Sequence, residues 1–134
     1  MRAVRLRCIA RALGTIALGL LVHERGHALG PVAQDVAGDA LWAMMIVWWV
    51  SALTPHSARL TRTAIALAVC VAVEMSQLSH APMLMTLRAT RLGVLVLGSG
   101  FDSRDLAAYA FGVTVAGVID ALLFQRPSAA TPDD

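Results

Sequence analysis

The sequence predicts an all-α polytopic membrane protein, built as a four-helix transmembrane bundle. Of its 134 residues, 57% are hydrophobic and 15% are charged, and the mean hydropathy is +0.67. Soluble domains carry more charge and less apolar mass. The apolar residues also come in long runs, not in the narrow stripes of a soluble amphipathic helix. We therefore expect a single transmembrane domain over residues 1–125 and a disordered polar tail over residues 126–134.

The first predicted span runs from about Cys8 to Val22 and follows an arginine-rich start. A basic start before a short apolar core is also typical of a signal peptide. No small-residue cleavage site follows, because Val22 leads directly into His23-Glu24-Arg25. We therefore expect a retained anchor helix.

The next spans are predicted at about Gly38–Leu53, Thr63–Leu78 and Leu106–Phe124. Pro55 and His56 mark the end of the second span. The first three apolar runs are nearer 15 than 20 residues, which is short for a hydrocarbon core of about 30 Å. Either the bilayer thins locally, or the helices continue past their apolar runs into a polar rim.

A shorter apolar segment, Leu92–Gly98, comes just before the last span and cannot cross a bilayer. Because Gly93, Gly98 and Gly100 surround it, we expect non-helical backbone in a re-entrant or interfacial segment. Such backbone is tolerated only where protein or water covers it.

The arginines predict the orientation. An inside N-terminus places Arg2, Arg5, Arg7, Arg11, Arg59, Arg62 and Arg126 on the cytoplasmic side, and Arg25, Arg88, Arg91 and Arg104 outside. The excess of inner arginines favours a multi-pass protein of the bacterial inner (cytoplasmic) membrane with both termini inside. The net charge of +2 is too small to indicate a nucleic-acid partner, and Cys8 and Cys70 are expected in the core rather than as a disulfide or metal pair.

This topology gathers the unusual polar residues at the outer end of the bundle, in what we call the predicted cup. Its candidate binding residues are Asp39, Glu74, Gln77, His80, Arg88, Arg91, Asp105 and Tyr109. At the inner end, Asp120 is expected to reach the lipid head groups. No cofactor is expected.

Glu74 is the most informative member of the cup. It follows the apolar run Ala64–Val73, and a carboxyl group in such a segment usually faces protein or a wet cavity rather than lipid. Gln77 lies three residues later on the same helical face.

A second stripe on the last span points Asp105 toward Glu74. Asp105, Tyr109 and Gly112 recur at helical spacing, and Gly112 with Ala116 forms a small-xxx-small pair that lets another helix come close. Two neighbouring carboxyl groups need an arginine, a shared proton or a cation. We expect Arg88 and Arg91 to be their partners.

Four ordered motifs carry a resemblance to a known family. They are Gly38-Asp-Ala-Leu-Trp-Ala43, Glu74-Met-Ser-Gln-Leu-Ser-His-Ala-Pro82, Arg88-Ala-Thr-Arg-Leu-Gly93, and Leu97-Gly-Ser-Gly-Phe101 followed by Asp105-Leu-Ala-Ala-Tyr109. From about Gly14 to Asp120 the chain resembles domain-of-unknown-function family 2809, a family of small bacterial membrane proteins.

The wider spacing of Glu74, Gln77, Arg88 or Arg91, Asp105 and Tyr109 is similar to the VanZ-like family, which usually has Asn where this chain has Tyr109. VanZ-like proteins are associated with glycopeptide tolerance and the cell envelope. The two resemblances imply a four-helix membrane fold with an outward-facing site, and they do not imply a particular reaction.

A competing motif is His23-Glu24-Arg25-Gly26-His27, which matches the H-E-x-x-H signature of zinc proteases. A helix continuing from the first span would present His23 and His27 on one face. The third ligand would come from Asp39, His80 or Asp105.

Three hypotheses follow. In the first, the cup holds the polar head of a lipid-linked or cell-wall precursor, with Arg88 and Arg91 on anionic groups and Glu74, Gln77 and Asp105 on hydroxyls or amines. In the second, the chain is an intramembrane zinc metalloprotease that uses His23 and His27. In the third, it is a membrane scaffold whose charges only hold helix ends together. Membrane lipid is the expected partner in each case, and the sequence leaves open whether the chain is an enzyme.

Overall fold

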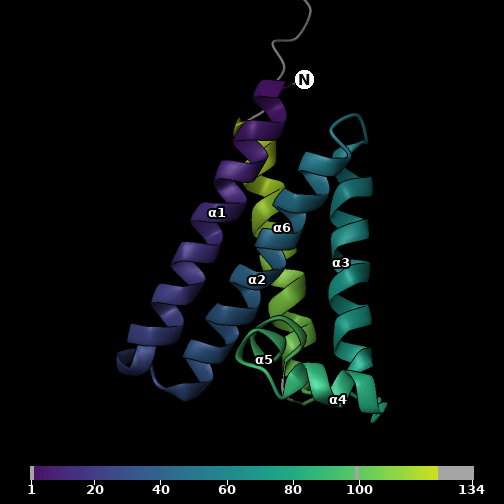
Figure 1. Ribbon diagram of the computed structural model, residues 1–134. Coiled ribbons are helices and arrows are strands. Elements are labelled where there is room, and N and C mark those ends of the chain that lie inside the picture. Colours follow the sequence, from purple (N-terminus) through teal and green to yellow (C-terminus); the bar gives the residue numbers. More distant parts are fainter. Residues whose placement is uncertain (1, 99, 124–134) are drawn as a thin grey trace, which may run out of the picture.

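The computed structural model describes residues 2–98 and 100–123, in which all the regular structure is helical (Figure 1). The elements are α1 (Arg2–Arg25), the 3-10 turn η1 (Gly26–Leu29), α2 (Pro31–Leu53), α3 (Arg59–Ser76), α4 (Pro82–Arg88), α5 (Arg91–Leu97) and α6 (Ser103–Leu123). The all-α prediction is confirmed for this part of the chain. The predicted tail over residues 126–134 lies outside the described residues.

Three segments are long and apolar enough to cross a membrane: α1 with η1 (Arg2–Leu29), α2, and α6. The 18-residue helix α3 is not among them, and it carries Arg59, Arg62 and Glu74. The described part of the chain is therefore all-helical and contains three candidate membrane spans.

The helices extend beyond the apolar runs from which they were predicted. Helix α1 begins at Arg2 rather than near Cys8, and α2 begins at Pro31 rather than Gly38. Pro31 occupies the first turn of α2, where its missing N–H costs nothing, and Gly30 turns the chain with a φ of 82°. Both helices are therefore longer than their apolar runs, because each continues into polar residues at one or both ends.

The prediction of non-helical backbone over Leu92–Gly98 is wrong, because this stretch forms most of α5. The Thr90 hydroxyl caps α5 by accepting a hydrogen bond of 2.9 Å from the N–H of Gly93. Gly93 therefore serves the cap instead of breaking the helix, and Gly98, with a φ of 71°, ends it. Sequence reasoning also missed α4, which begins at Pro82.

Helix α2 lies at the centre of the molecule and packs against α1, α3 and α6. Small residues dominate the contacts: Ala12, Ala43, Ala66, Cys70 and Ala116 are all fully buried. At Gly112 of α6, an added Cβ would overlap the carbonyl oxygen of Ala40 in α2. The α2 and α6 backbones therefore touch at this point.

An ion-pair cluster joins the helices at the end that carries the N-terminus. Asp120 is 3% exposed and lies 2.7 Å from Arg62 of α3 and 3.8 Å from Arg11 of α1. The Arg11 guanidinium also stacks on Trp48, 5.1 Å from the ring centroid. The expectation that Asp120 reaches the lipid head groups is wrong, because Asp120 holds α1, α3 and α6 together.

Replacing Gly112 with Ala should lower the stability of the protein, although Ala favours helix formation more than Gly does. Gly112→Ala should destabilise the protein by about 1–3 kcal/mol, because the new methyl group overlaps the α2 backbone. Gly14→Ala in α1 is the matched control, since a Cβ there meets nothing within 4 Å. It should leave stability unchanged or raise it by about 1 kcal/mol. Thermal unfolding in detergent measures both, and equal behaviour of the two variants would contradict the contact.

Candidate functional site

The end of the bundle opposite the N-terminus brings several helix ends together. Figure 1 places the end of α1, the start of α2, the end of α3 and the start of α6 at this end, together with α4 and α5. The side chains of interest therefore come from segments that are far apart in the sequence.

Glu74 is fully buried and forms the centre of this region. Its carboxyl oxygens accept three hydrogen bonds: 3.0 Å from the Tyr109 hydroxyl, 3.3 Å from the Gln77 amide and 2.8 Å from the backbone N–H of Asp102. The three donors belong to α6, the end of α3 and the loop before α6. Glu74 thus ties three segments together through neutral donors.

Tyr109 extends this network toward α2. It is 4% exposed, and its ring lies 5.6 Å from that of Trp42 at an interplanar angle of 46°. Two buried polar atoms beside it, Nε1 of Trp42 and Oε1 of Gln77, have no hydrogen-bond partner within residues 2–98 and 100–123. A bound polar group could satisfy both atoms.

A pair of carboxyl groups faces the network from α2 and α6. The side chains of Asp39 and Asp105 lie within hydrogen-bonding reach of each other. Two carboxyl groups can hydrogen-bond to each other only when they share a proton. The shared proton can be replaced by an ammonium group or another cation, and the protonated pair can also accept a hydrogen bond from a hydroxyl.

Asp39, Trp42, Gln77, Asp105 and Tyr109 line a cavity of about 630 Å³. We call it the cup cavity. Its polar lining residues are Thr15, His23, Gln34, Asp35, Asp39, Gln77, Asp102, Arg104, Asp105 and Tyr109. Its apolar wall includes Ile16 and Leu20 of α1, Leu41 and Met45 of α2, and Val94 and Val96 of α5. The cup cavity is therefore amphipathic, with an excess of acidic groups.

Arg104 is the arginine of the cup cavity wall, and it is already engaged. Its side-chain Nε lies 2.9 Å from Asp102, and its backbone N–H donates to the same carboxyl group at 2.9 Å. These contacts hold the pKa of Asp102 below its usual value, the side-chain hydrogen bond having the largest effect. Asp102 was not among the candidate binding residues, although its place just before α6 is typical of a residue that caps a helix.

Arg88, Arg91 and His80 are not where the sequence predicted. Arg88 donates to the carbonyl of Ser79 and the hydroxyl of Ser76, both at 3.2 Å, which ties α4 to the end of α3. Arg91 and His80 are exposed, and none of the three lines the cup cavity. The expectation that arginines neutralise Glu74 and Asp105 is wrong, because neutral donors and a carboxyl pair take that role.

The H-E-x-x-H motif does not form one helix face. Helix α1 ends at Arg25, and His27 lies in η1. Gln34 of α2 donates to the carbonyls of Val22 at 3.0 Å and of His23 at 2.7 Å, which satisfies the end of α1. In the described part of the chain, no group of three His, Cys, Asp or Glu side chains is placed to hold a metal ion.

Comparison with known proteins gives one family. The family described as "Protein of unknown function (DUF2809)" matches residues 29–113, which confirms the resemblance noted from the motifs. The match contains Asp39, Glu74, Gln77, Asp105 and Tyr109. No solved structure matches the chain.

The Glu74 network predicts coupling between α3 and α6. Tyr109→Phe keeps the aromatic ring but removes one donor, so it should cost about 1.5–3 kcal/mol. Combined with Glu74→Gln, the two effects should fail to add, with a coupling of about 0.5–3 kcal/mol in unfolding measurements. A cycle of Glu74→Gln with Phe111→Leu, an exposed position on α6, is the additive control. Additivity in both cycles would show that Tyr109 and Glu74 act independently.

Proposed function

The chain belongs to the DUF2809 family of proteins of unknown function, and we propose that it is a four-helix integral membrane protein that holds the polar head of a cell-envelope amphiphile. The observation that carries this proposal is the amphipathic cup cavity of about 630 Å³, whose apolar wall adjoins a carboxyl-rich one. Binding cavities of this volume usually combine an apolar lining with a few placed polar groups.

Helix α3 is the fourth span of this proposal. Two of its three charged side chains have partners: Arg62 pairs with Asp120, and Glu74 accepts three hydrogen bonds. Paired or hydrogen-bonded charges greatly reduce the cost of membrane burial. Arg59 opens the helix, where a long side chain can extend to the head groups.

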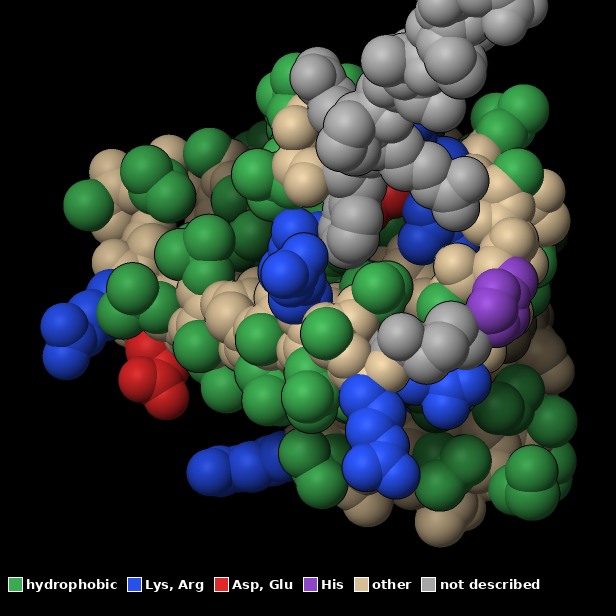
Figure 2. All heavy atoms as spheres, turned by 90° about the horizontal axis from the view of Figure 1, so that it is seen from above, with side chains coloured by type: hydrophobic (Ala, Val, Ile, Leu, Met, Phe, Trp, Pro, Cys, Tyr) green, Lys and Arg blue, Asp and Glu red, His purple; other side chains and the backbone are tan. Residues whose placement is uncertain are grey.

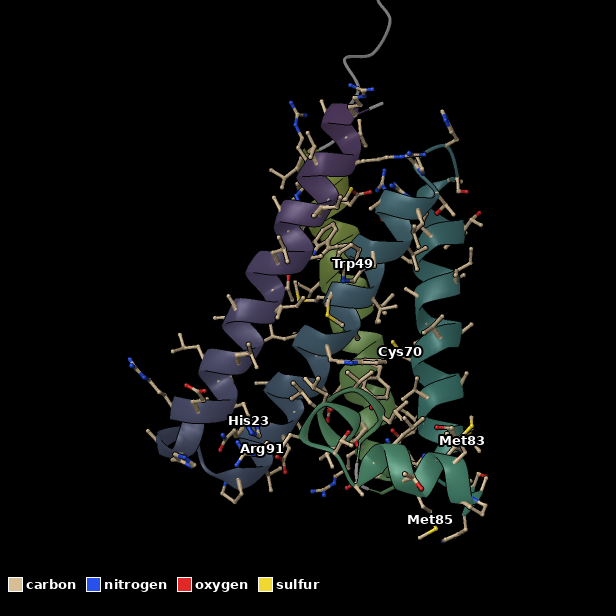
Figure 3. The ribbon with its side chains drawn as sticks, in the orientation of Figure 1. His23, Trp49, Cys70, Met83, Met85 and Arg91 are labelled. Atoms are coloured by element: carbon tan, nitrogen blue, oxygen red, sulfur yellow. The ribbon has the colours of Figure 1, made fainter. Side chains whose placement is uncertain are left out.

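Helices α4 and α5 are interfacial in this account. Each has seven residues, or about 10 Å of helix, which is far less than a bilayer core. Met83 and Met85 of α4 are 73% and 55% exposed and lie at the cup end of the bundle (Figure 3). Leu92 of α5 is 75% exposed. Such apolar side chains suit the boundary between lipid and water.

The chemistry of the wall favours a head group that donates hydrogen bonds. Asp35, Asp39 and Asp105 present acceptors to the cup cavity, while Arg104 is paired with Asp102. Amines and hydroxyls satisfy carboxyl groups, so we assign the head to these classes, as found in lipid-linked or cell-wall precursors. Arg88 and Arg91 are not assigned to an anionic group of the ligand, because neither residue lines the cup cavity.

The orientation follows from the arginines. Arg2, Arg5, Arg7, Arg11, Arg59 and Arg62 lie toward the end opposite the cup cavity. We therefore place that end in the cytoplasm and the cup cavity on the outer side of a bacterial inner membrane.

This orientation predicts a cytoplasmic C-terminus. A reporter that is active only in the cytoplasm should work when fused after residue 134, and a reporter that is active only outside should not. The same reporters inserted in the turn between α1 and α2 should give the reverse result. An active outer reporter at the C-terminus would refute the orientation.

The cup cavity predicts a molecule that co-purifies with the protein. Protein extracted with its surrounding lipid should carry an amine- or hydroxyl-bearing amphiphile enriched over the bulk membrane, as measured by mass spectrometry. Asp39→Asn and Asp105→Asn should each reduce its retention about tenfold, because each disrupts the carboxyl pair. The double variant should be no weaker than either single one, since the pair acts as a unit.

Glu24→Gln, at an exposed position outside the cup cavity, is the matched control and should retain the molecule. A purely structural role gives a different pattern. The wild type would then carry no enriched molecule, and the two Asn variants would accumulate poorly in the membrane.

A further inference from the structure

A second concave surface lies between α3 and α6, away from the cup cavity. This groove encloses about 500 Å³ and shares no lining residue with the cup cavity. Arg59, Leu60 and Thr63 of α3 form one side. A stripe of α6 from Val113 to Ala121 forms the other side.

The wall of the groove is apolar despite its two threonines. The Thr63 hydroxyl donates to the carbonyls of Arg59 and Leu60, and the Thr114 hydroxyl donates to that of Ala110. Because both hydroxyls bond to their own helix, they need no partner in the groove. Leu60 and Val118 add apolar surface that is 80% and 52% exposed.

Gly117 keeps the groove open. A Cβ at this position would lie 3.3 Å from the Thr63 methyl carbon, so a larger side chain would fill the space between the helices. The stripe from Val113 to Ala121 is about 12 Å long at 1.5 Å per residue. A narrow apolar path of this length matches an extended hydrocarbon chain.

One end of the groove is positively charged. Arg59 is exposed at the first residue of α3, and no ion pair of its side chain is recorded within residues 2–98 and 100–123. The next arginine, Arg62, is engaged by Asp120. Figure 2, which views this end of the molecule, shows several arginine side chains exposed over this face.

We infer that this groove binds an anionic phospholipid, with one acyl chain along α6 and the phosphate on Arg59. An acyl chain matches the apolar wall, and the phosphate supplies an anion for Arg59, which has no ion-pair partner in the described part of the chain. A second copy of the chain is disfavoured as the occupant, because a parallel neighbour would bring two arginine-rich ends together. The site is independent of the ligand proposed for the cup cavity.

Native mass spectrometry of the full-length protein in a neutral detergent tests this inference. Titration with phosphatidylglycerol should give binding about fivefold tighter than titration with phosphatidylcholine, the preference expected from one arginine at a membrane surface. Arg59→Gln should bring the two lipids to equal affinity. Arg25→Gln, which removes an exposed arginine at the opposite end, should keep the preference.

A second variant tests the hydrocarbon path. Gly117→Leu should weaken both lipids several-fold, while helical content and elution volume remain those of the wild type. Equal affinity of the wild type for the two lipids would overturn the proposal, as would a preference that survives Arg59→Gln. A dimer that is lost on Gly117→Leu would assign the groove to a second copy and would also overturn it.

Discussion

The buried carboxyl group of Glu74 is the interaction on which the cup end of the molecule depends. Its side chain is fully buried, and a buried carboxyl group needs hydrogen-bond partners. Its donors come from Tyr109, Gln77 and the backbone of Asp102. Satisfying one side chain therefore fixes the end of α3, the loop before α6 and the first turns of α6 relative to one another. Because Gln77 and Tyr109 also line the cup cavity, the same bonds hold its wall in place.

At the opposite end of the bundle, a second buried carboxyl group is compensated in a different way. Asp120 is almost as deeply buried as Glu74, but it is compensated by two arginines rather than by neutral donors. Arg62 and Arg11 both pair with Asp120, so this cluster serves to hold the helices together. Within the described residues the donors to Glu74 are neutral, and the neighbouring carboxyl groups of Asp39 and Asp105 lie within hydrogen-bonding reach of each other. That difference explains why we place a binding site at one end and a joint at the other.

The sequence predicted the helical class and the inward-facing stripe of α6, because apolar runs and helical spacing are local signals. The contact of Gly112 with Ala40 follows directly from that stripe. Which side chains bond to each other at the cup end could not be predicted in the same way. Arg88 was assigned to the carboxyl groups by charge, yet α4 turns it toward Ser76 and Ser79. The bond between Asp102 and Glu74 could not be predicted from side-chain chemistry, because the backbone N–H of Asp102 donates it. Likewise, α5 forms because of the cap at Thr90, which outweighs the glycine signal at Gly93.

The central claim is that a satisfied Glu74 supports an open, amphipathic cavity. An experimental structure of the protein in a lipid nanodisc tests it most directly. We expect the Glu74 carboxyl group to lie within hydrogen-bond distance of Tyr109, Gln77 and the Asp102 N–H. It also predicts density between α2 and α6 beside Asp39 and Asp105. A structure in which Glu74 faces lipid, or in which α5 fills the space between α1 and α6, would contradict it.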